Sequence, residues 1–119
     1  MQKFNFSLVT LFLFFFNLIF SQISPERVLY KSTNQADLNL FVYKPVDFDK
    51  SQTYSCIVFF HGGGWNSGDY KQFQRQSIYF ASRGMVAFSV EYRIRNKHGT
   101  SPIEAMEDAK SAIRFIRSN

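Results

Sequence analysis

The first hydrophobic stretch of the sequence covers residues 8–20 and is broken by only two polar residues. Lys3 lies before it and a small residue, Ser21, lies after it. The stretch is shorter than the ~20 apolar residues that a membrane-spanning helix needs. A basic start, a short apolar core and a small exit residue predict a secretory signal peptide over residues 1–21 and a secreted or periplasmic protein. A retained N-terminal anchor is the alternative.

Two β-like runs follow the leader, at residues 27–32 and 38–43. The second run has Leu, Leu and Val at its even positions and Asn, Phe and Tyr between them. The five residues 33–37, which separate the two runs, are polar enough to turn. This pattern predicts an antiparallel hairpin, and Pro45 marks the end of its second strand.

From residue 56 onward the pattern changes. Residues 56–60 form an unbroken apolar run, which predicts a strand covered on both faces, as in a parallel sheet. Residues 85–90 form a second such run. Between them, residues 71–83 place apolar side chains at near-helical spacing, and Gly84 suits the left-handed conformation that commonly follows a helix. Cys56 opens the first run and is expected to be a small buried hydrophobe.

The last segment is the clearest predicted helix and follows a loop at residues 91–100. Ser101 can cap it, Pro102 takes its first position, and Glu104 completes an S-x-x-E capping box. One face is apolar and consists of Ala105, Ala109, Ala112 or Ile113, and Ile116. The order of elements predicts an α/β fold, with an antiparallel hairpin first and a parallel β-α-β-α unit after it. Residues 22–119 are expected to belong to one such domain.

Composition changes this picture little. Seven of the fifteen phenylalanines lie in the leader, so the aromatic excess is mainly a targeting feature. The net charge is +5, and the basic residues are scattered apart from Arg93, Arg95 and Lys97. That cluster is expected to be a solvated loop, because a nucleic-acid surface needs a denser basic stripe. Cys56 is the single cysteine, so the chain has no internal disulfide and depends on its hydrophobic core.

Candidate chemistry lies in the segment His61-Gly62-Gly63-Gly64-Trp65, directly after the first buried strand. Consecutive glycines let a ligand approach backbone N–H groups closely, and such groups can hold a negatively charged oxygen. A phosphate loop is disfavoured because neither GxGxxG nor GxxxxGK[ST] is present. A metal site is disfavoured because His98 is the only other histidine. We expect no metal and no cofactor.

With its neighbours, this segment resembles the HGGG(W) motif that α/β-hydrolase esterases and lipases carry after their third strand. Tyr92-Arg93 after the next strand, and the helix that runs from Pro102 through Asp108-Ala109, resemble the hormone-sensitive-lipase-like branch. They also resemble the feruloyl- and acetyl-xylan-esterase-like (BD-FAE-type) branch. The match covers residues 38–117. It implies the N-terminal part of an α/β-hydrolase fold.

The resemblance implies a role for each residue of the motif. The N–H groups of Gly63 and Gly64 would line the oxyanion hole. Gly62 would let the chain turn, and His61 would brace the loop through its side chain. Trp65 would lie beside the acyl or leaving-group pocket, or would equally serve as a core residue.

Other residues receive supporting roles from the same resemblance. Tyr92 and Arg93 would fix the loop after their strand, and Asp108 would be structural. The family's catalytic serine lies in G-x-S-x-G, which this sequence does not contain, and Ser67 has the wrong spacing. The acid and the base come later still in the family's chain order. The nucleophile, the acid and the base are therefore expected to lie outside these residues.

The missing elements have physical consequences. In this fold the strand at residues 56–60 lies between two others, so without its second neighbour it would present an apolar open edge. We expect the chain by itself to be poorly folded and inactive.

The leading functional hypothesis is a secreted serine carboxylesterase that acts on small-molecule or polysaccharide-linked acetyl or feruloyl esters. We expect no nucleic-acid partner, and no membrane partner once the leader is removed. A non-catalytic exported interaction module and an α/β-hydrolase peptidase are the alternatives.

Overall fold

The computed structural model describes residues 23–119, so the predicted signal peptide lies outside the described residues. The elements in chain order are β1 (Glu26–Ser32), β2 (Asp37–Tyr43), β3 (Cys56–Phe60), the 3-10 turn η1 (Tyr70–Phe73), α2 (Gln74–Ser82), β4 (Val86–Val90), α3 (Arg95–His98) and α4 (Pro102–Ser118). The strands form one mixed sheet in the order β1-β2-β4-β3. β1 and β2 pair as the predicted antiparallel hairpin, β2 and β4 are antiparallel, and β3 and β4 are parallel.

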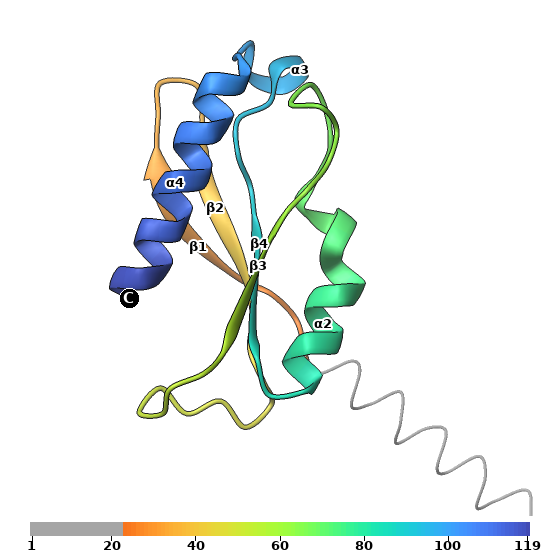
Figure 1. Ribbon diagram of the computed structural model, residues 1–119, viewed down its shortest axis with the longest axis vertical. Coiled ribbons are helices and arrows are strands. Elements are labelled where there is room, and N and C mark those ends of the chain that lie inside the picture. The colour runs from red at the N-terminus through yellow and green to blue at the C-terminus, as the bar shows by residue number, and fades with distance from the viewer. Residues whose placement is uncertain (1–22) are drawn as a thin grey trace, which may run out of the picture.

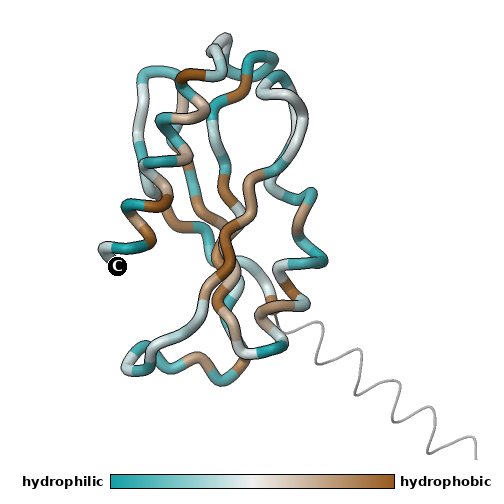
Figure 2. Tube along the Cα trace, viewed as in Figure 1, coloured by the Kyte–Doolittle hydropathy of each residue, from teal (hydrophilic) through white to brown (hydrophobic). Residues whose placement is uncertain are grey.

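One helix covers each face of the sheet, which gives three layers (Figure 1). Successive side chains of a strand point to opposite faces, so the same strands pack against α2 on one face and α4 on the other. On one face, Phe41, Tyr43 and Ala87 pack with Ala81 of α2. On the other, residues from β2 and β4 pack with the α4 side: Leu40, Val42, Val86, Val90 and Ala112. The hydrophobic residues accordingly lie where the strands cross at the centre of the molecule (Figure 2). The predicted α/β class is confirmed.

The helix boundaries follow local signals for the most part. Ser101 accepts a hydrogen bond from Ile103 N–H, and the Glu104 side chain accepts one from Ser101 N–H, so the predicted capping box is present. Gly84 follows Arg83, the C-cap of α2, and has a φ of 86°, as predicted. The predicted helix at residues 71–83 differs at its start, where a 3-10 turn capped by Asp69 precedes α2. The short helix α3, inside the predicted loop 91–100, was not predicted.

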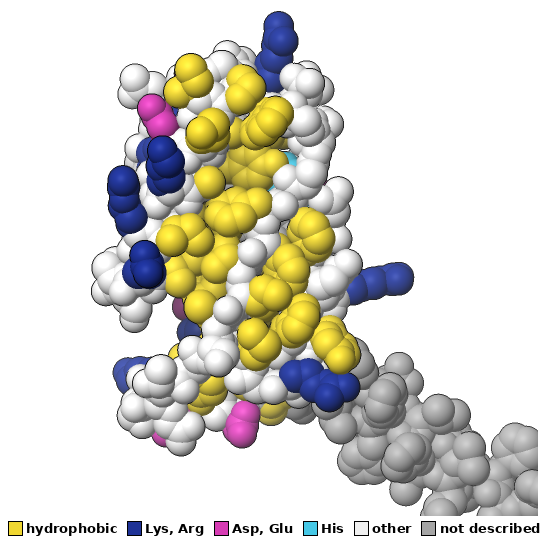
Figure 3. Space-filling view, viewed as in Figure 1, with side chains coloured by type: hydrophobic (Ala, Val, Ile, Leu, Met, Phe, Trp, Pro, Cys, Tyr) yellow, Lys and Arg dark blue, Asp and Glu magenta, His cyan; other side chains and the backbone are white. Residues whose placement is uncertain are grey.

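Strand β3 is an edge strand of the sheet and is only half-buried. Both of its faces carry packing, as predicted, because Ile57 and Phe59 join the α2 side and Val58 joins the α4 side. Its outer edge has no partner strand among residues 23–119. The prediction that Cys56 is buried is wrong, because this edge leaves the thiol exposed. Hydrophobic side chains gather in a band over this face of the molecule (Figure 3).

Candidate active site

The His61–Trp65 segment leaves the sheet at the end of β3, beside the end of the parallel strand β4. Its backbone takes conformations that favour glycine, with a φ of 133° at Gly63 and 59° at Gly64. A Cβ at Gly63 would lie 2.0 Å from the carbonyl oxygen of Ser67, so no larger residue fits there without moving the loop. The Gly63 carbonyl accepts hydrogen bonds from Asn66 N–H at 3.1 Å and Ser67 N–H at 3.2 Å, which closes the turn.

The three glycines differ in what their N–H groups contact. Gly62 N–H donates to the side-chain oxygen Oε1 of Gln72 at 2.7 Å. Within the described part of the chain, the N–H groups of Gly63 and Gly64 have no hydrogen-bond partner. Both glycines border a cavity of about 350 Å³ at the carboxyl ends of the parallel strands β3 and β4. Two backbone donors thus remain available beside an open cavity.

The cavity is mainly apolar, and its far wall comes from α4. Ala105, Met106 and Ala109 line it opposite the glycines, together with Phe60 and Tyr92. Sequence reasoning did not include the α4 residues or Gln72 in the site. The α4 residues lie about 40 positions after the glycines, and in the sequence they show only the periodicity of a helix face. Gln72 lies only ten positions after Gly62, but no motif distinguishes it.

His61 is buried and lies within the loop's own contacts. Its ring stacks on the ring of Tyr92, with centroids 4.3 Å apart, and its Nδ1 lies 3.0 Å from the carbonyl oxygen of Gly62. The hydroxyl of Tyr92 donates to the backbone carbonyl of His61. Burial raises the pKa of Tyr92, so the phenol stays protonated and keeps this hydrogen bond at neutral pH. The histidine and the tyrosine together fix the start of the loop.

Trp65 lies on the rim of the cavity and is 50% exposed. Among the described residues its indole is not enclosed by the sheet and helices, and this exposure favours the position beside the pocket over the core role. Its φ of 62° is unusual for a residue with a side chain, and it is the only such non-glycine residue in the described chain. The loop therefore presents this side chain outward, where a ligand can contact it.

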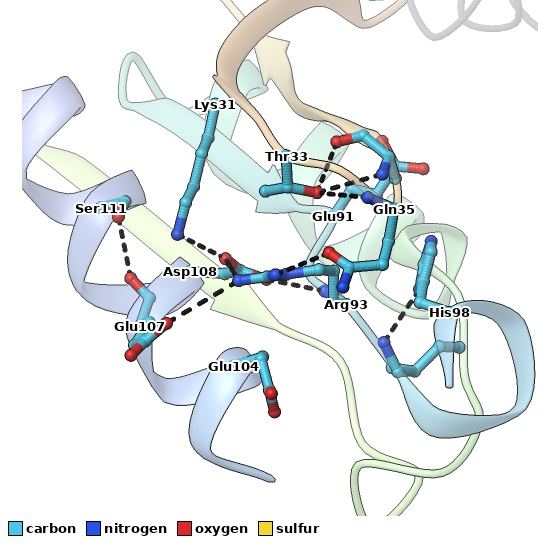
Figure 4. Close-up of polar contacts among 12 residues, drawn as sticks. Lys31, Thr33, Gln35, Glu91, Arg93, His98, Glu104, Glu107, Asp108 and Ser111 are labelled. Carbon is cyan, nitrogen blue, oxygen red and sulfur yellow. Dashed lines mark hydrogen bonds and ion pairs between the residues drawn. The ribbon is translucent and has the colours of Figure 1, made fainter. Parts of the chain in front are cut away.

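Behind the loop, three side chains form a buried charged cluster (Figure 4). The Asp108 carboxylate is fully buried and accepts from Nε of Arg93 at 2.9 Å, from Nη2 of Arg93 at 2.9 Å and from Nζ of Lys31 at 2.7 Å. The structure agrees with a structural role for Asp108. The prediction that Arg93 belongs to a solvated loop with Arg95 and Lys97 is wrong, because the Arg93 side chain is only 8% exposed. Lys31 was not predicted to take part.

The cluster sets the ionisation of its members. Burial raises the pKa of the Asp108 carboxyl, but hydrogen bonds from Arg93 and Lys31 outweigh this effect, and the net pKa is lowered. The pKa of Arg93 is raised, mainly by its hydrogen bond to Asp108. Both groups therefore stay charged. No group of three or more potential metal ligands occurs within residues 23–119. None of the helices described there is long and apolar enough to cross a membrane.

The BD-FAE family model matches residues 40–119. A thermophilic esterase, Est2 from the Planctomycetes species Thermogutta terrifontis, solved with propionate bound, is 45% identical with a TM-score of 0.78, over 80% of this chain and 35% of its own. The same esterase phosphonylated by cyclosarin gives 46% identity and a TM-score of 0.77, over 79% of this chain and 36% of its own.

A curated relative, neuroligin-like protein glit-1 from Caenorhabditis elegans, is 30% identical over 89 residues, which are 69% of this chain and 12% of the relative. The chain thus spans about a third of the solved esterases and about an eighth of the curated relative. Its fold, with a mixed four-stranded sheet between helices, matches the N-terminal part of an α/β-hydrolase esterase. The chain belongs to the BD-FAE family.

Proposed function

We propose that this chain supplies the oxyanion-binding part of a secreted serine carboxylesterase. The observation that carries the proposal is the pair of unpartnered N–H groups at Gly63 and Gly64, beside an apolar cavity at the end of a parallel strand. When a nucleophile attacks an ester carbonyl, the carbonyl oxygen gains negative charge. Fixed N–H donors stabilise that charge, and the loss of one donor costs about 2.7–4 kcal/mol in the transition state.

In this proposal the other residues of the loop have supporting roles. His61 and Gly62 hold the loop, through Tyr92 and Gln72 respectively. Trp65 contacts the bound ester at the rim of the cavity. The attacking serine and its acid and base come from outside residues 1–119, since no G-x-S-x-G occurs among them.

We further propose that the substrate is a carboxylic ester, either a small molecule or an acetyl or feruloyl group linked to polysaccharide. The apolar lining of the cavity supports a hydrocarbon acyl part, because burial of apolar surface is favourable. The related esterase was solved with propionate and with butyrate bound. The exposed indole of Trp65 offers a flat surface for an aromatic acyl group or a sugar ring.

A chimera tests the catalytic proposal. The matched part of this chain replaces its counterpart in the Thermogutta terrifontis esterase, and hydrolysis of p-nitrophenyl butyrate is measured. We expect kcat/KM within about tenfold of the parent enzyme, because a misformed oxyanion hole would cost ~10²–10³-fold. The 119-residue chain by itself is expected to show no hydrolysis above the uncatalysed rate.

The fold of the chimera is checked by circular dichroism and by a thermal melt. A cooperatively folded chimera that does not hydrolyse the ester would contradict the proposed role and would favour the non-catalytic interaction module. Replacement of the p-nitrophenyl ester by a p-nitroanilide of the same acid compares the esterase with the peptidase alternative.

Export is tested separately with a leaderless reporter fused behind residues 1–30. We expect export, with cleavage directly after Ser21, as determined by mass spectrometry of the mature N-terminus. The variant Phe15→Arg places a charge in the apolar run and is expected to abolish export, whereas Phe15→Leu is expected to preserve it. An exported but uncleaved, membrane-bound reporter would show that the segment is a retained anchor.

A further inference from the structure

The glycine loop is held from a second side by helix α3. The backbone N–H of Arg95 donates to the carbonyl oxygen of Trp65 at 2.9 Å, and the N–H of Asn96 donates to the carbonyl oxygen of Asn66 at 3.0 Å. Trp65 and Asn66 are the two residues that follow Gly64. Their carbonyls therefore have fixed directions, and they belong to the same loop as the unpartnered donors.

Helix α3 is itself closed by local contacts. The His98 side-chain Nδ1 accepts from Ile94 N–H at 3.0 Å, and His98 N–H donates back to the Ile94 carbonyl at 2.9 Å. Gly99 ends the turn with a φ of 67°, and its N–H donates to the Arg95 carbonyl at 2.8 Å. One helical turn would be marginal in isolation. Here the two ends of the turn are tied together.

The turn is also anchored to the body of the domain. Arg93, two residues before α3, contacts Asp108 of α4 through its guanidinium and through its backbone N–H, which donates to Oδ2 at 3.0 Å. Tyr92, the residue before that, donates to the carbonyl of His61. The segment 92–99 therefore contacts the start of the glycine loop through Tyr92 and the end of the loop through Arg95 and Asn96. Between these contacts, Arg93 fixes the segment to α4.

We propose that α3 is a positioning element for the Gly63 and Gly64 N–H groups, and this inference rests on the proposed function. Transition-state stabilisation by backbone donors depends on their direction being fixed before the reaction, so that no reorganisation is needed. The Gly63 carbonyl closes the turn from inside, and the Arg95 and Asn96 N–H groups hold it from outside. The Trp65 carbonyl shares its peptide plane with the Asn66 N–H, which donates to the Gly63 carbonyl, and that carbonyl shares its plane with the Gly64 N–H. Without the contacts from α3, these linked planes could rotate and turn the Gly64 donor.

The variant Arg95→Pro tests this inference at a single N–H group. Proline lacks the N–H that contacts Trp65, yet it suits the first position of a helix, and Ile94 before it is extended with a ψ of 151°, as a residue before proline requires. Arg95→Ala is the matched control, because it removes the exposed side chain and keeps the N–H. Both variants are made in the chimera with the Thermogutta terrifontis esterase.

We expect Arg95→Pro to lower kcat about 100-fold with KM within about threefold, since small misplacements of catalytic groups have effects of this size. Arg95→Ala is expected to change kcat by less than about twofold. Binding of a trifluoromethyl ketone, which forms an oxyanion adduct, should weaken in parallel with kcat/KM. A merely structural role would lower the melting temperature of Arg95→Pro and leave kcat and inhibitor affinity per folded enzyme unchanged, which would overturn the inference.

Gly99 offers a second pair of variants if Arg95→Pro does not fold. A Cβ at Gly99 meets no atom within 4 Å, so only its left-handed backbone conformation is affected. Gly99→Val strains that conformation, whereas Gly99→Asn tolerates it, so kcat should fall in the first and be retained in the second. Equal kcat values in the two variants would contradict the inference.

The two proposals fail in different ways. An inactive parent chimera would count against the proposed function. The inference is then judged by NMR, from the order of the Gly63 and Gly64 amides in Arg95→Pro and Arg95→Ala. Equal amide order in the two variants would overturn the inference, and lower order in Arg95→Pro alone would support it.

Discussion

Replacement of Asp108 by Asn is expected to lower the free energy of unfolding by about 3–5 kcal/mol, the largest effect on stability that the described contacts predict. Asp108 is fully buried and is the common acceptor for Arg93 and Lys31. The variant leaves the nearly buried guanidinium of Arg93 with only the exposed Glu107 carboxylate, 3.9 Å away, as a counter-ion, and a poorly paired buried charge is costly. Urea unfolding of the chimera, followed at 222 nm, measures the loss.

The ion pair between Lys44 and Glu26 provides the matched control. Its nitrogen and oxygen lie 2.6 Å apart, but the side chains are 37% and 57% exposed. Exposed pairs contribute about 0–1 kcal/mol, so Glu26→Gln is expected to have little effect. Equal losses in Asp108→Asn and Glu26→Gln would show that the buried cluster does not stabilise the domain.

The stability difference between the parent and Asp108→Asn is expected to depend on pH. The folded-state pKa of Asp108 lies below its usual value, because the hydrogen bonds from Arg93 and Lys31 outweigh the opposite effect of burial. The stability that Asp108 contributes is therefore present above its unfolded pKa of about 3.9 and is lost as the pH falls through the lower folded pKa. The unfolding free energies of the parent and of Asp108→Asn should approach each other in this acidic range. A constant difference down to full protonation would contradict this origin.

The second large effect is expected at Gly63. Gly63→Ala should lower kcat/KM of the chimera at least about 100-fold, as is typical when an oxyanion donor is lost. The new Cβ would lie 2.0 Å from the carbonyl oxygen and 2.6 Å from the carbonyl carbon of Ser67. These are backbone atoms, so the loop must move and the two donors move with it.

Gly64→Ala is the matched control for Gly63→Ala. A Cβ at Gly64 meets no atom within 4 Å, and only its φ of 59° is unfavourable, at a cost of about 1–2 kcal/mol. We expect a much smaller loss of kcat/KM in Gly64→Ala. Similar kcat/KM values for the two variants would show that the tight turn at Gly63 is not needed for catalysis.

The sequence by itself determined the features that depend on neighbouring residues. The hairpin, the capping box at Ser101 and the left-handed Gly84 were all predicted, because turn chemistry, helix caps and two-residue alternation act within a few positions of the chain. The glycine segment was likewise located at the end of a parallel strand from the apolar run before it. The α/β class followed from the order of these local signals.

Only the tertiary structure decided the features that depend on contacts between distant segments. Cys56 is exposed because β3 is an edge strand of the sheet. The burial of Arg93 depends on Asp108 and on Lys31, which lies 77 positions before Asp108. The wall of the cavity opposite Gly63 and Gly64 comes from α4.

Helix α3 is also a feature that only the tertiary structure decided, although its own hydrogen bonds join residues close in the chain. A four-residue turn has too few internal hydrogen bonds to be encoded by periodicity. Its contacts with Trp65 and Asn66, and the Arg93–Asp108 pair beside it, join segments that are distant in the chain. The sequence thus specified where two backbone donors occur, and the packing of α3 and α4 around them decided how they are held, since side chains far apart in the chain meet only after the sheet has formed.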